Sequence, residues 1–256
     1  MTGNHTSPSS RGFTLIELLV VIAILALLLA IFTPALDQLK DLAAMVSCAD
    51  RMRQMGMAMM GYADEAKLRI PGPNWRRAHH RGWLYSDLQM DQLEHLRSGL
   101  MWPYLRGVDS YRCPDDYDED PDMVPHRPNN SRMITSYCMN GSVCGYGHRA
   151  QVAATDGSTC DLHGQPWVFW DTYKWTEYEA NDVIMWEADE TTSQKGWWHD
   201  GSNFPWEGIT QRHIDRGNTV CADGHAEWML LTDYYAMDCA GKTRLWNTPG
   251  KANGRW

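Results

Sequence analysis

The chain has 256 residues, 43% apolar and 21% charged, a composition typical of a globular protein rather than a disordered or fibrous one. Its formal net charge is -9, from 23 basic and 32 acidic residues. This balance argues against electrostatic capture of a nucleic-acid backbone or of an anionic membrane surface, so no nucleic-acid partner is expected.

The segment from residue 13 to residue 36 is almost entirely apolar, with only Thr14, Glu17, Thr33 and Pro34 as exceptions. As a helix, this segment spans roughly 36 Å, which exceeds the hydrocarbon core of a bilayer at about 30 Å. The residues that follow it lack the small-residue cleavage site of a secretory signal. The sequence therefore predicts a membrane-spanning helix.

Charges in and around this helix indicate its orientation and its partners. Arg11 is the only Lys or Arg upstream of it, which places the N-terminus in the cytoplasm and the remainder outside. Glu17 is a carboxylate inside the apolar segment, and such a group costs about 2.5 to 3.5 kcal/mol to insert. No basic residue lies within one turn of Glu17. We therefore expect its partner to come from another chain or from a newly created amino terminus.

Pro34 lies near the end of the apolar segment. It removes one helical hydrogen bond and should kink or loosen the helix.

Residues 11–22 resemble the class III signal of type IV pilins and of the pseudopilins of type II secretion. The resemblance implies that a prepilin peptidase cleaves after Gly12 and methylates Phe13, which makes residues 1–12 a leader. It further implies that Glu17 pairs with the N-terminal amine of an identical or related subunit during filament assembly. The implied location is the bacterial inner membrane, crossed once, with the head in the periplasm or outside the cell in a filament.

Beyond Pro34, apolar residues recur at steps of three and four, the pattern of an amphipathic helix. One helix is expected from residue 13 to residue 66, with residues 13–36 in lipid or a filament core and residues 37–66 against a head. Gly56 and Gly61 indicate close packing or a bend. The expected packing stripe consists of Leu39, Leu42, Val46, Ala49, Met52, Gly56, Met59 and Ala63.

Residues 67–256 should form a loop-rich head with a small antiparallel sheet, so the expected fold class is α+β and pilin-like. A short helix is expected over residues 86–96, and strands over residues 167–170 and 183–186. The strongest local signal is a hairpin within residues 213–231, whose strands flank Asp223 and Gly224. This Asp-Gly pair is typical of a type I′ turn, in which both residues have positive φ angles.

Landmarks along the chain resemble the pilin-like proteins with a C-terminal H-X9-DG domain, which are abundant in planctomycetes. These landmarks are Cys48, Cys113 before a proline, Cys138 before Met-Asn, and the motif formed by His213, Asp223, Gly224 and His225. Two interpretations of the motif remain open. It forms a structural hairpin, or His213, Asp223 and His225 meet as a metal or acid/base cluster.

The acidic run over residues 115–122 has two interpretations as well: a solvated loop, or a calcium site that uses Asp116, Asp118 and Asp120. The spacing of the run excludes an EF-hand, because the sixth and twelfth positions counted from Asp116 are Pro121 and Arg127. Apart from this calcium interpretation, no cofactor is expected.

The chain has seven cysteines. Because the head faces an oxidising compartment, disulfides are expected, and an odd count leaves one thiol over. The candidates in the loop-rich part are Cys113, Cys138, Cys144 and Cys160. A zinc interpretation has less support, since no Cys-x-x-Cys pair exists.

The 13 tryptophans suit either a core filled by large rings or an aromatic surface for a ligand. The expected function is that of a structural filament subunit without enzymatic activity. The alternative is a membrane- or filament-displayed module that binds glycans or cargo through Trp197, Trp198 and Trp206. A hydrolase built on His213, Asp223 and His225 lacks a nucleophile motif such as G-x-S-x-G.

Overall fold

The computed structural model describes residues 13–72, 74, 82–85, 96–116, 135–143, 151–153, 168–170, 172–188 and 201–255. The chain divides into two units, residues 1–42 and residues 43–256. The boundary falls inside a helix, so the C-terminal part of that helix belongs to the same unit as the head.

Helix α1 spans Leu15–Glu65, 51 residues, and includes Pro34. The single long helix predicted over residues 13–66 is therefore confirmed. Every side chain from residue 13 to residue 43 is exposed. Within α1 lies a stretch long and apolar enough to cross a membrane, near the N-terminus and with none of it buried inside the protein. This exposed apolar surface needs lipid or other chains to cover it.

The face of α1 that packs on the head differs in part from the predicted stripe. The prediction was right for Met52, Gly56, Met59 and Ala63. It was wrong for Leu39, Leu42 and Val46, which are exposed. The first buried residue is Met45, and packing against the head rather than hydropathy decides which positions are buried. The buried face consists of Met45, Cys48, Met52, Met55, Gly56, Ala58, Met59 and Ala63.

The head contains a five-stranded sheet with the order β5-β1-β4-β6-β7. The strands are β1 (Tyr137–Asn140), β4 (Val183–Glu187), β5 (Ser202–Asn203), β6 (Arg216–Cys221) and β7 (Ala226–Leu230). Strands β1 and β5 are parallel and the other pairs are antiparallel, so the sheet is mixed rather than purely antiparallel as expected.

Two further strands, β2 (Gln151–Ala153) and β3 (Val168–Trp170), form a separate antiparallel pair. The predicted strands at residues 167–170 and 183–186 thus match β3 and β4 within one residue. Helix α3 (Leu231–Cys239) follows β7. The described residues also form short 3-10 helices: η1 (Val108–Tyr111), η2 (Trp175–Glu177) and η4 (Pro205–Glu207). The predicted helix over residues 86–96 lies outside the described residues except for Leu96.

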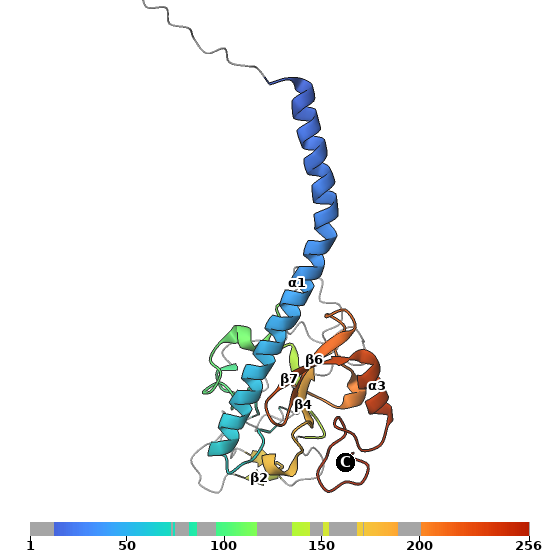
Figure 1. The fold of residues 1–256 in the computed structure, drawn as a ribbon. Helices are drawn as coiled ribbons and strands as arrows, with labels where there is room; N and C mark the ends of the chain where they lie inside the picture. The colour runs from blue at the N-terminus through green and yellow to red at the C-terminus, as the bar shows by residue number, and fades with distance from the viewer. Residues whose placement is uncertain are drawn as a thin grey trace, which may run out of the picture. The chain divides into compact units, whose positions relative to one another are not determined.

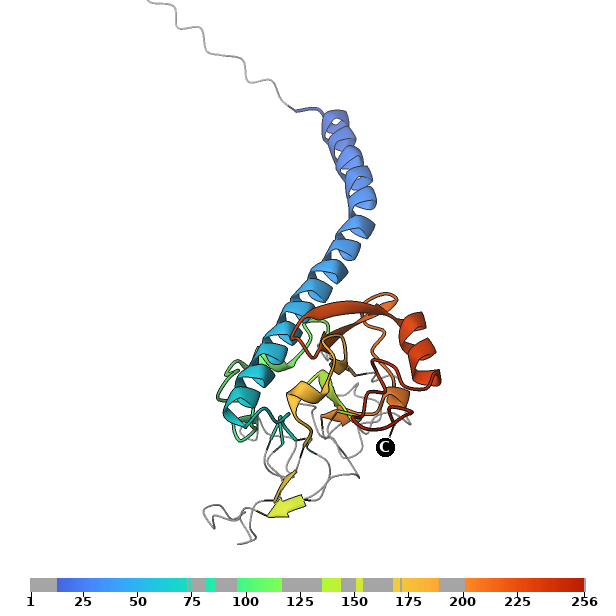
Figure 2. The same cartoon turned by 60° about the horizontal axis from the view of Figure 1, so that its bottom comes forward.

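The five-stranded sheet separates two hydrophobic cores because successive strand residues point to opposite faces. In β1, Tyr137 and Met139 belong to a core shared with α1, whereas Cys138 belongs to a core shared with Tyr234 of α3. Figures 1 and 2 show α3 and the C-terminal half of α1 on opposite sides of these strands. The head is therefore a helix–sheet–helix arrangement, in which one face of the sheet packs against α1.

The hairpin between β6 and β7 is present, but its turn is not of type I′. Gly224 has a φ of 84°, whereas Asp223 is not among the residues with positive φ. Gly224 N–H donates to the Cys221 carbonyl at 2.9 Å, and Cys221 N–H donates to the His225 carbonyl at 2.9 Å. These bonds close a three-residue loop that needs only one left-handed residue, its glycine.

Tryptophan serves mainly as a core residue where the structure describes it. Trp83, Trp186 and Trp246 are fully buried. Their Nε1–H groups donate to the carbonyls of Gly201 at 2.9 Å, Gly208 at 2.9 Å and Asp238 at 3.0 Å. The indole ring thus fills the core while its one polar atom pairs with the backbone. Trp206 is 51% exposed. Trp197 and Trp198 lie outside the described residues.

Candidate functional site

The N-terminal end of α1 holds the residues expected to take part in processing and assembly. Gly12 lies outside the described residues. Phe13 is 74% exposed. Glu17 accepts hydrogen bonds from the Thr14 backbone N–H at 2.8 Å and from the Thr14 hydroxyl at 2.7 Å, both at Oε2. The Glu17 N–H in turn donates to Thr14 Oγ1 at 3.3 Å.

These reciprocal bonds are a capping box, with Thr14 at the N-cap and Glu17 as the third helical residue. The expectation that Glu17 has no partner in its own chain is therefore wrong. The sequence carries the signal, since Thr14-Leu15-Ile16-Glu17 has the capping-box spacing. Among the described residues, no hydrogen bond involves Oε1, so this second carboxylate oxygen can still accept a hydrogen bond from another chain.

A second group of functional side chains lies between α1 and the sheet. Cys48, Cys113, Glu187 and His213 are all buried, and one sulfur, nitrogen or oxygen atom of each lies within 4.8 Å of the others. The Cys48 thiol donates to Glu187 Oε1 at 2.5 Å. His213 Nε2 lies 3.1 Å from the same oxygen and 3.4 Å from Cys113 Sγ. We call these four residues the buried cluster.

Separate elements bring the buried cluster together. Cys48 lies on the packing face of α1, and Glu187 ends β4 on the sheet face that looks at this helix. Cys113 follows η1. His213 precedes β6 at a tight turn, in which Arg216 N–H donates to the His213 carbonyl at 3.0 Å. The next residue, Ile214, has a φ of 59°, a left-handed conformation that a β-branched residue adopts only when its surroundings force it.

The surroundings of the buried cluster hold its members in place. Asn218 donates to Glu187 Oε2 twice, from its backbone N–H and from Nδ2, both at 2.9 Å. These bonds leave Oε1 directed toward the thiols and the imidazole. The Tyr137 hydroxyl lies 3.2 Å from Cys48 Sγ. On the other side of the imidazole, Asp115 Oδ2 lies 3.3 Å from His213 Nδ1.

In the buried cluster, the charged pair is Glu187 and His213. Burial alone would raise the pKa of Glu187, but the hydrogen bond and charge of His213 outweigh it and lower that pKa to about 2. Burial likewise opposes a charged His213, yet its bonds to Cys113 and Glu187 raise the pKa of the imidazole to about 10. The hydrogen bond with Cys48 lowers the pKa of Cys113 to about 7. Burial raises the pKa of Cys48.

Of the two interpretations of the H-X9-DG motif, the one in which His213, Asp223 and His225 meet as a cluster is not supported. His213 is in the buried cluster, whereas His225 pairs with Asp223 on the hairpin turn and lies 3.7 Å from Glu227. His225 also forms a surface group with Cys221 and Glu227 that could hold a metal. However, the Arg244 guanidinium donates to Cys221 and Glu227 and supplies a positive charge there already.

The calcium and disulfide candidates are only partly described. Asp116 is buried, contrary to the expected solvated loop, because it accepts a hydrogen bond from Ser136 and lies 3.9 Å from Arg212. Asp118, Asp120, Cys144 and Cys160 lie outside the described residues. Cys113 and Cys138 are buried in different cores. Disulfide formation therefore stays a prediction.

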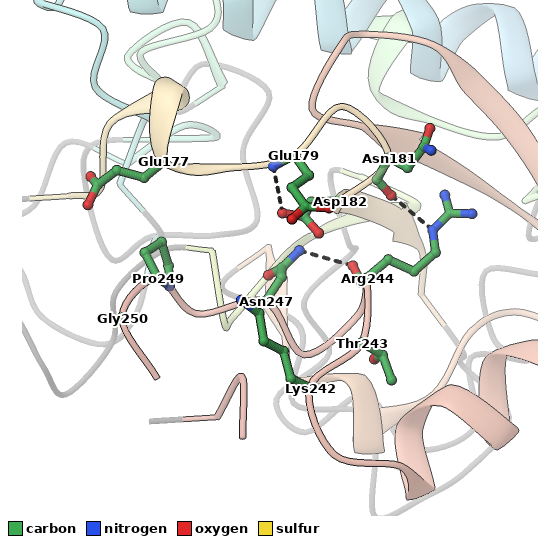
Figure 3. A pocket seen from close by; sticks show the side chains of 10 residues that line it. All are labelled: Glu177, Glu179, Asn181, Asp182, Lys242, Thr243, Arg244, Asn247, Pro249 and Gly250. Carbon is green, nitrogen blue, oxygen red and sulfur yellow. Dashed lines mark hydrogen bonds between the residues drawn. The ribbon is translucent and has the colours of Figure 1, made fainter. Parts of the chain in front are cut away.

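A polar pocket of about 700 Å³ opens elsewhere on the head (Figure 3). Its side chains are tied to the backbone around it: Arg244 Nε donates to the Asn181 carbonyl at 2.9 Å, and Asp182 accepts the Glu179 N–H at 2.9 Å. The lining residues include neither cysteine nor histidine, so they offer no nucleophile–base pair of that kind. They are Glu177, Glu179, Asn181, Asp182, Lys242, Thr243, Arg244, Asn247, Pro249 and Gly250.

Comparison with known proteins assigns one segment of the chain to a family. Residues 7–33 match the family of the prokaryotic N-terminal methylation motif. No curated protein and no solved structure matches the chain. The matched motif and the long helix that begins inside it at Leu15, with an apolar N-terminal part, support a type IV pilin-like protein. The chain thus carries the signal of a prepilin peptidase substrate with a membrane-anchored N-terminus.

Sequence reasoning noted Cys48, Cys113 and His213 separately but did not bring them together, and it missed Glu187. Cys48 and Glu187 are 139 residues apart, and Cys113 and His213 are 100 apart. No short-range spacing marks such a group. One signal was available for Glu187: it ends the run Val-Ile-Met-Trp-Glu, where a carboxylate within a buried strand requires a partner.

Proposed function

We propose that this protein is a structural subunit of a type IV pilus-like filament or a type II secretion pseudopilus. In this proposal, prepilin peptidase cleaves the chain after Gly12 and methylates Phe13, and the mature subunits assemble through α1. The head lies in the periplasm or outside the cell. The observation that supports the proposal most directly is the methylation motif at residues 7–33, which overlaps the start of α1, a helix whose side chains are all exposed up to residue 43.

The physical reason for assembly is the uncovered surface of the first unit. Leu15, Leu19 and Ile31 are 80%, 54% and 64% exposed, and the same holds all round the helix. Such a surface is stable in a bilayer, and on leaving the bilayer it must be buried against equivalent helices. The free Oε1 of Glu17 would accept the amine of a neighbouring Phe13, because a charge in low dielectric is stabilised by a close opposite charge.

The proposal includes no enzymatic activity. Cys113 and His213 lie 3.4 Å apart, as a nucleophile and its base do, but each is about 1% exposed. A substrate could not approach the sulfur without opening the core. Among the described residues, Trp206 and Trp228 are 51% and 45% exposed, whereas Trp197 and Trp198 lie outside them, so the alternative of an aromatic ligand surface stays a prediction.

The test uses the full chain in cells with and without a prepilin peptidase. With the peptidase, mass spectrometry should find a mature chain that starts at methylated Phe13, and without it the uncleaved chain. Glu17→Ala should be cleaved but fail to enter filaments, whereas Glu65→Ala, at the other end of α1, should enter them normally. Recovery of only the uncleaved chain beside an active peptidase would contradict the proposal. So would normal filaments from Glu17→Ala.

A further inference from the structure

The buried cluster has the ligand types of a zinc site. It offers two thiol sulfurs, one imidazole nitrogen and one carboxylate oxygen, which are the donors that Zn²⁺ takes in proteins. Their number equals the tetrahedral coordination of structural zinc. We propose that Cys48 Sγ, Cys113 Sγ, Glu187 Oε1 and His213 Nε2 bind one Zn²⁺ ion, which fastens the C-terminal half of α1 to the head.

The distances between the donor atoms fit this ion with one adjustment. Zinc bonds of about 2.3 Å to sulfur and about 2.0 to 2.2 Å to nitrogen or oxygen give tetrahedral edges of about 3.6 Å for S–N and about 3.4 Å for N–O. The corresponding distances are 3.4 Å from Cys113 Sγ to His213 Nε2 and 3.1 Å from His213 Nε2 to Glu187 Oε1. The Cys48–Glu187 edge, at 2.5 Å, is a thiol hydrogen bond that must widen when the ion replaces the proton.

The residues behind the donors are arranged as zinc sites require. A zinc-bound histidine usually directs its other ring nitrogen toward a carboxylate or a carbonyl, which fixes the ring. Here His213 Nδ1 is buried without a hydrogen bond, and Asp115 Oδ2 lies 3.3 Å away. The two bonds from Asn218 hold the distal oxygen of Glu187 and present Oε1 to the ion.

Zinc binding exchanges protons for a metal ion at this point. Zn²⁺ displaces the two thiol protons and the proton that His213 Nε2 shares with Glu187, and it is then bound by two thiolates, a carboxylate and an imidazole. Without an ion, the Glu187 carboxylate has 0% exposure and is paired with His213. A divalent cation would replace this pairing and would also offset the cost of burying two thiolates. The surface group of Cys221, His225 and Glu227 is a weaker candidate, because Arg244 already donates to two of its members.

The geometry makes this a structural site. All four ligand positions come from the protein and all four residues are buried, so no coordination position is open to a substrate. The competing chemistry is a disulfide between Cys48 and Cys113, which an oxidising compartment would promote. A disulfide would leave the imidazole and carboxylate without a role, and it is a distinct outcome of the test.

The experiment uses the full chain, purified in detergent from zinc-supplied cells and handled with a reductant that does not bind metals. Elemental analysis should find about one zinc per chain. Cys113→Ser and His213→Ala should lower zinc affinity by about 100-fold or more, since even residues behind the ligands change affinity by about 10- to 100-fold. The matched controls Cys239→Ser, which changes an exposed cysteine, and His225→Ala should keep the ion.

A cobalt measurement on the wild-type chain keeps the proposal testable even if the variants fail to fold. Co²⁺ added to the metal-free wild-type chain should produce visible bands of a tetrahedral site and a sulfur-to-cobalt charge-transfer band. Absence of both zinc and these bands in folded, reduced wild-type protein would overturn the proposal. Zinc retained equally by Cys113→Ser and His213→Ala would also overturn it, as would a Cys48–Cys113 disulfide in protein alkylated before lysis.

Discussion

Gly56 of α1 packs so closely on Val220 of β6 that a Cβ atom at position 56 would lie 2.7 Å from Val220 Cγ1. Val220 is buried and β-branched, so its side chain has little freedom to move away. The helix therefore approaches the sheet through a position that only glycine fits. Gly56→Ala should destabilise the head, because overpacking costs about 1 to 3 kcal/mol, against a gain of about 1 kcal/mol in helix propensity.

Thermal unfolding of the detergent-solubilised chain would measure this effect. Gly241→Ala is the control, since nothing lies within 4 Å of a Cβ at that position. In the Gly56→Ala background, Val220→Ala should cost less stability than it does in the wild type, because it removes the clash. Equal costs in both backgrounds would show that the close approach is not the cause.

Asn218 should be the most sensitive neighbour of Glu187. Asn218→Ala removes one hydrogen bond to a buried carboxylate and should lower the free energy of unfolding by about 1 to 3 kcal/mol. Asn218→Asp should cost more, because it keeps the shape but places a second carboxylate beside Glu187. Chemical denaturation would rank the variants, with the exposed Asn253→Ala as the control. If Asn218→Asp has the same free energy of unfolding as Asn218→Ala, the Glu187 carboxyl is not charged in the folded protein.

Ile214 should be a site where substitution stabilises the protein. Its φ of 59° costs an ordinary residue about 1 to 2 kcal/mol, and its side chain is 73% exposed and so contributes little packing. Ile214→Asn should raise the melting temperature, since asparagine tolerates the left-handed conformation. Ile214→Val keeps the β-branch and should give no gain. A lower melting temperature for the asparagine variant would mean that the isoleucine side chain makes contacts that matter.

Glu17→Gln separates the two roles of this residue. Glutamine can replace glutamate in a capping box but carries no charge. If the charge drives assembly, Glu17→Gln should fail to enter filaments as Glu17→Ala does, although the start of the helix remains capped. Filament yield by electron microscopy is the measurement. Recovery of filaments with Glu17→Gln would assign the residue to helix capping alone.

Asp223 should make the stability of the hairpin depend on pH. The His225 backbone N–H, which donates to Asp223 Oδ1 at 3.0 Å, lowers the pKa of this carboxyl below its ordinary value of 3.8. A lowered pKa stabilises the folded state above the ordinary value, and the contribution is lost as pH falls through the folded pKa. The stability difference between wild type and Asp223→Ala should therefore shrink between pH 5 and pH 2. A constant difference would contradict this.

The parts of the fold that were predictable depend on local patterns. An apolar run and a three-to-four repeat indicated α1, and alternating residues around Asp223 and Gly224 indicated the β6–β7 hairpin. The predictions that were wrong concern details that depend on tertiary contacts. The helix buries Met45 and Cys48 instead of Leu42 and Val46, because the sheet decides which face is covered. The turn uses one positive φ angle instead of two, because the loop has three residues.

The candidate sites likewise differ in whether local sequence patterns could predict them. Glu17 and the methylation motif are contiguous, so the sequence alone indicated them, although the local bond with Thr14 was overlooked. The buried cluster could not be predicted, since its members come from segments that only the folded chain brings together. Asp116 illustrates the converse error. Its acidic neighbours suggested a solvated loop, but Ser136 and Arg212 draw its carboxylate into the head.

Four of the eight buried residues on the packing face of α1 are methionines. Thioether side chains adapt readily to an uneven surface, which suits a helix laid across a twisted sheet. They are also the apolar side chains most readily converted to polar sulfoxides. Oxidants that reach Met52, Met55 or Met59 during a transient opening would therefore loosen the helix from the head, and methionine sulfoxide reductases would reverse that damage.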